Sequence, residues 1–212
     1  EVLHKAGRKD LKLTKAALEK VRDLLTDAKV QKALGANYVD ELSAICKAQG
    51  GFSGAKSLVA HLDDVKAFCN KFADKEGFDQ VVASTKNSNG NVQDGLQHVL
   101  TQVNKADFDA GKVSKFDMEF EGEGLPCTRC KFDVQLSDGN KPKLIEYKSY
   151  LDASRIQLPQ FLNYIASVNE LEEMKYVFNT AKLSTEQARE GMKNFMSNAS
   201  NKQAIFDAMK AD

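Results

Sequence analysis

The sequence predicts an α/β protein in which a mixed sheet of about four strands, flanked by helices, follows an N-terminal helical extension. Over about the first 80 residues, apolar residues recur every three to four positions, which is the spacing of one helix face. Beyond residue 113 apolar and polar residues alternate, which is the spacing of a strand. A polar stretch at residues 84–91 separates the two patterns. We therefore expect a helical accessory region over residues 1–85 and an α/β core over residues 86–212.

The accessory region is expected to contain three helices. The first covers residues 8–34, where five apolar residues share one helix face: Leu11, Leu18, Val21, Leu25 and Ala28. The second covers residues 38–47, and the glycine-rich segment 49–54 ends it. The third covers residues 56–75.

The α/β core is expected to begin with a helix and a strand. Asn91 can cap a helix that carries an apolar stripe from Val92 to Val103. The spacing then changes to two in a run of alternating apolar and acidic residues: Phe116, Asp117, Met118, Glu119, Phe120 and Glu121. This run predicts the first strand of the sheet.

The remaining elements complete the order helix, three strands, helix, strand. A helix is expected over residues 154–169 and a short strand over residues 175–179. Ser184 then begins a final helix, with Gln187 placed to complete a capping box.

The second and third strands are predicted to form a hairpin. Phe132 and Val134 alternate with the polar residue Asp133, and Glu146 and Lys148 lie two apart on the next strand, so they share a face. The turn can be Asp-Gly or Gly-Asn within residues 138–140. The Gly-Asn turn places Asp133 directly opposite Glu146, and the Asp-Gly turn leaves the two diagonal, within about 5–8 Å in either case.

An aspartate followed, after a spacer, by an acid-x-lysine resembles the PD-(D/E)xK nuclease superfamily, the restriction-endonuclease-like fold. Twelve residues separate Asp133 from Glu146, and Glu146-Tyr147-Lys148 supplies the second half of the motif. The amino-acid sequence of residues 132–134 and 145–150 is most similar to nuclease domains of bacterial polymorphic toxins. The resemblance covers roughly residues 113–181, and Phe132 stands where some members have proline.

The resemblance implies a divalent-metal site for the hydrolysis of phosphodiesters. Asp133 and Glu146 would be ligands of Mg²⁺ or Mn²⁺, together with the main-chain carbonyl of Tyr147. Lys148 would orient the attacking water or offset charge in the transition state. Gln160, on the helix that follows, would touch the scissile phosphate or the water. Simple solvent exposure is the alternative for Gln160.

Other acids and a histidine give weaker candidates. Some members of the superfamily use an acid on the helix before the sheet, and here Asp94 is available, with Glu41 more remote. The acidic edge of the first strand offers Glu119 as an extra ligand, although a solvated strand face is the simpler interpretation. His98 lies one helical turn from Asp94, but no histidine-metal motif accompanies it.

A purely structural alternative accounts for the hairpin. In a chain with 28% charged residues, an aspartate followed by Glu-x-Lys arises by chance, and cross-strand ion pairs on a solvent-facing hairpin contribute less than about 1 kcal/mol each. The agreement of the motif with the strand–turn–strand pattern and with the order of elements favours the catalytic interpretation.

Composition limits the remaining possibilities. The net charge is zero, so the whole chain gives no electrostatic case for nucleic-acid binding. The chain has no run of 18 apolar residues, so no membrane span is expected. Cys127 and Cys130 have the spacing of two zinc ligands, but no second pair completes a four-ligand set, so ordinary thiols or a local redox pair are expected.

These observations and the resemblance lead to one expected function. We expect a Mg²⁺-dependent, nonspecific DNase. The resemblance alone implies that it is an antibacterial toxin effector domain, part of a larger secreted polypeptide, with a cognate immunity protein as partner. Such an effector would act in the cytoplasm of the target cell. The alternatives are an RNase, a cytoplasmic repair or resolvase-type nuclease, and a catalytically silent protein-binding module.

Overall fold

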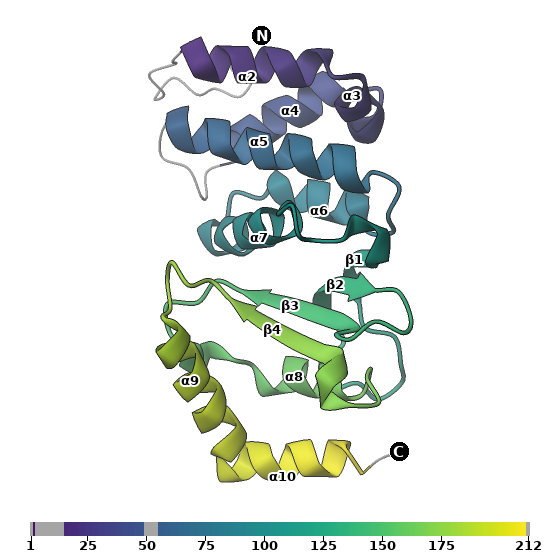
Figure 1. Ribbon diagram of the computed structural model, residues 1–212, viewed down its shortest axis with the longest axis vertical. Coiled ribbons are helices and arrows are strands. Elements are labelled where there is room, and N and C mark those ends of the chain that lie inside the picture. The colour runs from purple at the N-terminus through teal and green to yellow at the C-terminus, as the bar shows by residue number, and fades with distance from the viewer. Residues whose placement is uncertain (1, 3–14, 49–54, 211–212) are drawn as a thin grey trace. The chain divides into compact units, whose positions relative to one another are not determined.

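The computed structural model describes Val2, residues 15–48 and residues 55–210 (Figure 1). The chain divides into two compact units, Glu1–Gly111 and Lys112–Asp212. The first unit is helical where it is described, and the second holds the sheet. The division falls after Gly111, so the helix expected to open the α/β core at residue 92 belongs instead to the helical unit.

The helical unit contains six described helices. Their bounds are α2 Lys15–Thr26, α3 Ala28–Leu34, α4 Tyr38–Lys47, α5 Ala55–Phe72, α6 Phe78–Thr85 and α7 Gly90–Val103. Helix α5 contacts α2, α3 and α7, and its side chains Leu58, Leu62 and Phe72 are fully buried. These helices therefore pack apolar faces around α5, as their amphipathic spacing predicts.

The single helix expected over residues 8–34 is broken at Asp27. The Asp27 carboxylate accepts hydrogen bonds from the main-chain N–H groups of Lys29 and Val30, at 2.9 and 3.1 Å. Asp27 is thus the N-cap of α3, a position that aspartate favours over the interior of a helix. Residues 8–14 of that prediction, and the glycine-rich segment 49–54, lie outside the described residues.

Two further details of the helical unit differ from expectation. Helix α6 is an addition to the three expected helices: residues 76–83 carried no expected element, and its last two residues fall in the expected polar loop. Asn89, rather than Asn91, caps α7: its side chain accepts from the N–H groups of Asn91 and Val92. The earlier start leaves Val92 exposed in the first turn instead of in the apolar stripe.

The sheet unit contains a four-stranded mixed sheet in the order β1-β2-β3-β4. The strands are β1 Val113–Glu119, β2 Lys131–Leu136, β3 Leu144–Lys148 and β4 Met174–Phe178. Neighbours pair antiparallel from β1 to β3, and β3 and β4 pair parallel. Strand β3 therefore lies inside the sheet, with a hydrogen-bonded neighbour on each side.

The β2–β3 connection is longer than the predicted two-residue turn. It covers residues 137–143, and Asn140 N–H donates to the carbonyl of Ser137 at 3.3 Å. Pro142 has no N–H to add to the ladder, which opposes continuation of the strands into a tight turn. The register is nevertheless that of the Gly-Asn alternative, because Val134 pairs with Ile145 and Gln135 with Leu144.

Helices cover one side of the sheet. The parallel β3–β4 pair needs a crossover, which runs through α8, Leu158–Ile165. The 3₁₀ turns η2 (Ala153–Arg155) and η3 (Leu171–Glu173) flank α8, so this helix is shorter than predicted. Helices α9 (Thr185–Ser197) and α10 (Ala199–Ala208) follow, and α8 and α10 lie on the same side of the sheet (Figure 1).

The helix expected to be the last begins as predicted, but it ends at Ser197, and a further helix, α10, starts after the N-cap Asn198. Ser184 is the N-cap of α9, and Gln187 completes a capping box with it. Helix α9 packs closely against the turn η2 at Gly191. A Cβ on Gly191 would come within 1.9 Å of the Ala153 Cβ, so only glycine permits this close approach.

An aromatic cluster holds α8 against the sheet. Phe132, Leu144 and the fully buried Tyr164 form its centre. The Phe120 ring meets the rings of Phe132 and Tyr164 edge-on, with centroids 5.6 and 4.8 Å apart. This packing fixes the side of α8 that carries Gln160 and Tyr164 over the centre of the sheet.

Candidate functional site

Strand β3 carries the two most deeply buried charged residues of the sheet unit. All five residues of β3 are buried, and Glu146 and Lys148 are only 4% and 7% exposed. Strand β3 is therefore not part of a solvent-facing hairpin, which the structural alternative required. Charged groups at this depth require partners of opposite charge or strong hydrogen bonds.

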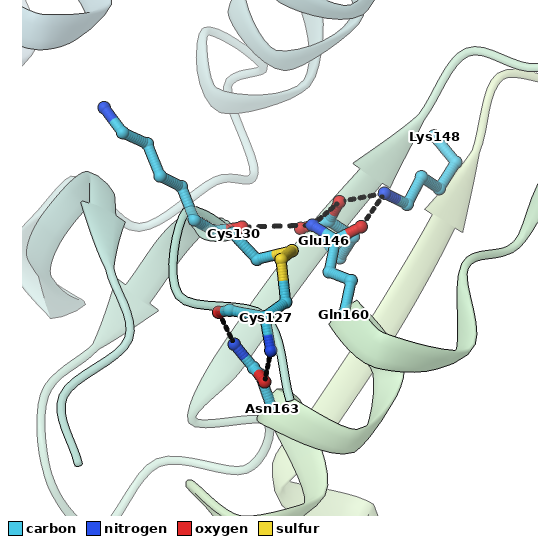
Figure 2. Close-up of a disulfide and its surroundings, with 7 residues drawn as sticks. Cys127, Cys130, Glu146, Lys148, Gln160 and Asn163 are labelled. Carbon is cyan, nitrogen blue, oxygen red and sulfur yellow. Dashed lines mark hydrogen bonds and ion pairs between the residues drawn. A yellow bond between two sulfur atoms is a disulfide. The ribbon is translucent and has the colours of Figure 1, made fainter. Parts of the chain in front are cut away.

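Both oxygens of the Glu146 carboxylate have partners. One oxygen, Oε1, forms an ion pair with Lys148 Nζ and accepts from Gln160 Nε2 at 3.1 Å. The other, Oε2, accepts from the hydroxyl of Tyr164. Figure 2 shows Glu146, Lys148 and Gln160 pointing toward one another from β3 and α8. The acid-x-lysine pair and the helix thus form one connected polar cluster.

Gln160 joins this cluster to the start of β2. Its Oε1 accepts from Lys148 Nζ at 2.8 Å, and its Nε2 donates to Glu146 and to the main-chain carbonyl of Lys131, at 3.1 Å each. The structure therefore brings Gln160 to the motif, as expected, and not to open solvent. Gln157, one turn earlier, is exposed.

Asp133 lies one residue beyond the last β2–β3 pair, where the register places it opposite Glu146. Its Oδ2 accepts from the main-chain N–H of Tyr147 at 2.6 Å. Burial, and then the negative charge of Glu146, raise the pKa of Asp133 well above its usual range. The Glu146 carboxylate is therefore close enough to disfavour ionisation of Asp133.

The charge of Lys148 depends on the same carboxylates. Burial is the largest single influence and lowers the pKa of Lys148, but the charge and hydrogen bond of Glu146, together with Tyr150 and Asp133, raise the pKa on balance. Its ammonium also lies 5.4 Å from the ring centroid of Tyr150 and 5.9 Å from that of Tyr176. Lys148 is thus held as a cation between a carboxylate, an amide and two aromatic faces.

Two tyrosines of the site were not among the expected site residues. Tyr164 is four residues after Gln160, so helical spacing alone puts both on one face of α8. Burial raises the pKa of Tyr164, and the charges of Glu146 and Asp133 add to this, so its hydroxyl stays protonated and donates. Tyr176 is paired with Glu146 across the parallel β3–β4 ladder, and no local pattern indicates that pairing.

The acidic residue nearest the motif on β1 is Asp117, not Glu119. The pairs Phe116–Val134 and Met118–Phe132 place Asp117 opposite Asp133. Its negative charge contributes to the raised pKa of Asp133, and Lys131 lies 3.6 Å away.

The other two acids of the acidic edge point elsewhere. Glu119 is exposed, and Glu121 pairs with Lys115 at 3.3 Å. Asp94, Glu41 and His98 belong to the helical unit, where Glu41 pairs with Lys86 at 2.7 Å.

The donor set of the motif fits a hard divalent cation. Mg²⁺ commonly takes one or two protein carboxylates and fills its other positions with water and phosphate oxygens. Asp133 and Glu146 supply such carboxylates. Burial and then the negative charge of Glu146 raise the pKa of Asp133, and a cation would offset that negative charge. Within the ranges that the structure describes, no three His, Cys, Asp or Glu side chains form a group that could hold a metal ion.

Cys127 and Cys130 form a disulfide just before β2. In the bridged form neither sulfur is a zinc ligand or an ordinary thiol, and a local redox pair stays a prediction. Cys46 and Cys69 are buried in the helical unit.

No protein family, no curated protein and no solved structure matches this chain. The fold class is α/β, with a four-stranded mixed sheet flanked by helices. In the described part of the chain no helix has the length and apolar character needed to cross a membrane. What the site can do follows from its own residues.

Proposed function

We propose that this protein is a divalent-metal-dependent nuclease of the PD-(D/E)xK superfamily with a restriction-endonuclease-like core. The observation that carries the proposal is the polar cluster of Glu146, Lys148 and Gln160, with Asp133 beside it, at the centre of the sheet. A buried lysine–carboxylate pair contributes little to stability compared with apolar residues of similar size, so its presence inside a sheet favours a chemical role.

The carboxylates of Asp133 and Glu146 and the carbonyl of Tyr147 would hold Mg²⁺ or Mn²⁺. When bound, the metal supplies charge neutralisation at the phosphate and a more acidic water. Asp133 takes part only when ionised. Its hydrogen bond from Tyr147 N–H favours the ionised form, whereas burial and Glu146 oppose it.

Lys148 and Gln160 would act on the substrate side of the site. Lys148 keeps its charge in the buried site, so it can offset the negative charge that develops on the phosphate oxygens. Gln160 has both an acceptor and a donor at the same place, so it can orient a water and a phosphate oxygen together. Tyr164 holds the Glu146 carboxylate in position.

The substrate we propose is DNA, cut without sequence preference. The similarity of residues 132–134 and 145–150 to toxin nucleases supports an antibacterial effector domain of a larger secreted polypeptide, with a cognate immunity protein as partner. Such an effector would act in the target-cell cytoplasm. An RNase and a repair or resolvase-type nuclease use the same chemistry on other substrates.

Nicking of supercoiled plasmid in Mg²⁺ tests the activity. The wild-type chain should nick the plasmid, and Glu146→Ala and Asp133→Ala should not. Glu170→Ala is the matched control, because this exposed glutamate of the same unit pairs only on the surface, with Lys141 at 2.5 Å. Full nicking by Glu146→Ala would rule out the site, and cleavage of RNA alone would replace DNA as the substrate.

Expression in bacteria tests the toxin role. Wild type should stop growth and Asp133→Ala should not, at equal protein levels. An active nuclease that leaves growth unchanged would favour the repair or resolvase alternative.

One observation favours a second candidate, a catalytically silent binding module. Both Glu146 oxygens are bonded within the protein, as in a purely structural polar cluster. A structural cluster predicts that no divalent cation changes the unfolding midpoint. The nuclease predicts that Mg²⁺ or Mn²⁺ raises this midpoint in wild type and not in Asp133→Ala.

A further inference from the structure

The disulfide-bridged loop lies next to the candidate site. Cys127 and Cys130 are only partly buried, and the two residues between them, Thr128 and Arg129, are exposed. Cys130 is followed directly by Lys131, the first residue of β2. The bridge is therefore open to small reductants on one side and continuous with a strand of the site on the other.

Asn163 of α8 fastens this loop to the helix. The Cys127 N–H donates to Asn163 Oδ1 at 3.1 Å, and Asn163 Nδ2 donates to the Cys127 carbonyl at 2.6 Å. Asn163 is fully buried, and Figure 2 shows its amide facing the main chain of Cys127. A buried amide that satisfies both main-chain groups of one residue fixes the position of that residue closely.

A second link connects the loop to the catalytic cluster. Gln160 Nε2 donates to the carbonyl of Lys131, and the same amide contacts Glu146 and Lys148. Gln160 and Asn163 are three residues apart, so they lie on the same face of α8. The helix thus holds the two ends of the bridged loop, at Cys127 and just after Cys130, through two side chains.

We propose that the Cys127–Cys130 disulfide is a reversible redox switch that positions Gln160 in the site. With the bridge closed, the Lys131 carbonyl and the Cys127 main chain are held at a fixed separation, which matches the spacing of Gln160 and Asn163 on α8. With the bridge open, the loop gains conformational freedom, and the Gln160 amide loses a fixed acceptor. The proposal rests on the proposed nuclease function, since Gln160 is assigned its role there.

The reduction is an ordinary thiol–disulfide exchange with a dithiol. One thiolate of the dithiol attacks a sulfur of the bridge, which breaks the S–S bond and forms a mixed disulfide. The second thiolate attacks the mixed disulfide and leaves the reductant oxidised. Two electrons and two protons are thereby transferred to Cys127 and Cys130, which become thiols.

The remaining cysteines do not interfere with the chemistry. Cys46 and Cys69 are buried, and burial raises the pKa of Cys69 to about 12. Since the thiolate is the reactive species, Cys69 is almost wholly unreactive at neutral pH. Alkylation of the folded protein therefore reports the state of the bridge.

The first experiment compares plasmid cleavage by the oxidised and dithiothreitol-reduced full chain, with alkylation used to measure the bridge. Reduction should lower kcat by about tenfold, as loss of one positioning group does, with little change in KM. Cys127→Ser/Cys130→Ser should show the lowered kcat in both conditions. Equal kcat for the fully bridged and fully reduced chain overturns the proposal.

A second pair of variants tests the route through α8. Asn163→Ala removes both bonds to Cys127, so it should lower kcat with the bridge intact and make it less sensitive to reduction. Ser167→Ala is the matched control, because its hydroxyl donates to the Asn163 carbonyl at 2.8 Å and its own contact does not involve the loop. An Asn163→Ala chain that retains the full response to reduction overturns the route.

Amide hydrogen exchange separates failure of this proposal from failure of the nuclease function. Reduction should speed exchange in β2 and α8 of wild type and leave α9 unchanged. If exchange responds but neither redox state cuts nucleic acid, the bridge positions the cluster and the nuclease function is wrong. If exchange in β2 and α8 does not respond to reduction, the switch is wrong, whatever the chain cleaves.

Discussion

The two units use the same residue types in different ways. In the helical unit, Lys71 Nζ donates to the main-chain carbonyls of Val103, Lys105 and Phe108, at 2.9 to 3.1 Å. Gln93 Nε2 also donates to main-chain carbonyls, which lie just before α7 and belong to Ser84, Thr85 and Asn87. In the sheet unit, Lys148 and Gln160 bond mainly to other side chains.

This difference separates groups that complete the fold from groups that are available for chemistry. Carbonyls at the end of a helix or in a loop need donors wherever they are shielded from water, so Lys71 and Gln93 satisfy requirements of the main chain itself. Glu146 and Lys148, by contrast, supply charge and hydrogen bonds to each other and to neighbouring side chains. Because a fold gains little from burying such a pair, the sheet unit is where removal of polar side chains should cost function more than stability.

The largest effect expected is on cleavage by Glu146→Gln/Lys148→Met. Replacing both members of the pair removes the charges together, so the unfolding free energy should stay within about 1 kcal/mol of wild type. Plasmid cleavage should fall by about 10³-fold or more, because the developing charge loses its cation. Denaturant unfolding and cleavage kinetics measure the two quantities. A double variant that is strongly destabilised would show that the pair serves the fold.

The reverse result is expected for Lys71→Met in the helical unit. Three carbonyls lose their shared donor, at about 1 kcal/mol each, so the helical unit should be destabilised by about 3 kcal/mol. Cleavage per folded molecule should equal that of wild type. Urea unfolding followed by helical circular dichroism measures the first, and plasmid cleavage well below the unfolding midpoint measures the second. Loss of cleavage in the folded variant would contradict the division of roles.

Local signals in the sequence predicted the parts of the fold that local interactions determine. Helix α4 has the expected bounds of residues 38–47, and the Ser184–Gln187 capping box is present. The β2–β3 register agrees with one of the two expected alternatives, because the alternation of apolar residues leaves few ways to pair the strands. The break at Asp27 was missed because its apolar spacing continues across the cap.

The missing parts of the site depend on contacts between distant segments. Tyr176 reaches Glu146 only because β4 pairs parallel to β3 after a crossover through α8. Asp117, and not Glu119, lies opposite Asp133 because of the β1 register. Asp117 also has a φ of 44°, and an alternating sequence pattern reveals neither feature. The lack of a second ligand pair argues against zinc at Cys127 and Cys130, but their spacing alone does not distinguish ordinary thiols from a bridged pair.

Gln93, which is buried, and Gln160, which is partly buried, give a smaller test of the same division. Gln160→Ala should lower kcat by about tenfold or more, as loss of one positioned group does, and change stability little. Gln93→Ala leaves three carbonyls, in buried or partly buried contacts, without their donor, so it should cost about 2 kcal/mol of stability and leave cleavage unchanged. Measuring both variants for both properties completes the comparison. Equal loss of cleavage in the two variants would contradict it.

The smallest effect expected is a difference in pH dependence between Asp27 and Asp133. Hydrogen bonding to Val30 N–H lowers the pKa of Asp27, whereas burial and Glu146 raise that of Asp133. Asp27 therefore adds stability above pH 3.8, and this contribution is lost as the pH falls through its lowered pKa. For Asp133 the folded state holds the proton more tightly than the unfolded state, so stability is lost as the pH rises from 3.8 through the raised pKa.

Asparagine variants at the two positions isolate these contributions. Without divalent metal at pH 7, Asp133→Asn should be more stable than wild type, by on the order of 1 kcal/mol, because wild-type Asp133 must either ionise in a buried site beside Glu146 or take up a proton on folding. The gain should disappear below pH 3.8, where wild type is protonated in both states. Asp27→Asn should show no gain at pH 7, because asparagine caps a helix as well as aspartate does. Urea unfolding in a chelating buffer at several pH values measures all three chains. An Asp133→Asn variant less stable than wild type at pH 7 would mean that the hydrogen bond from Tyr147 N–H outweighs the repulsion between the two carboxylates, and the motif would then lack the excess negative charge on which its fit to a cation depends.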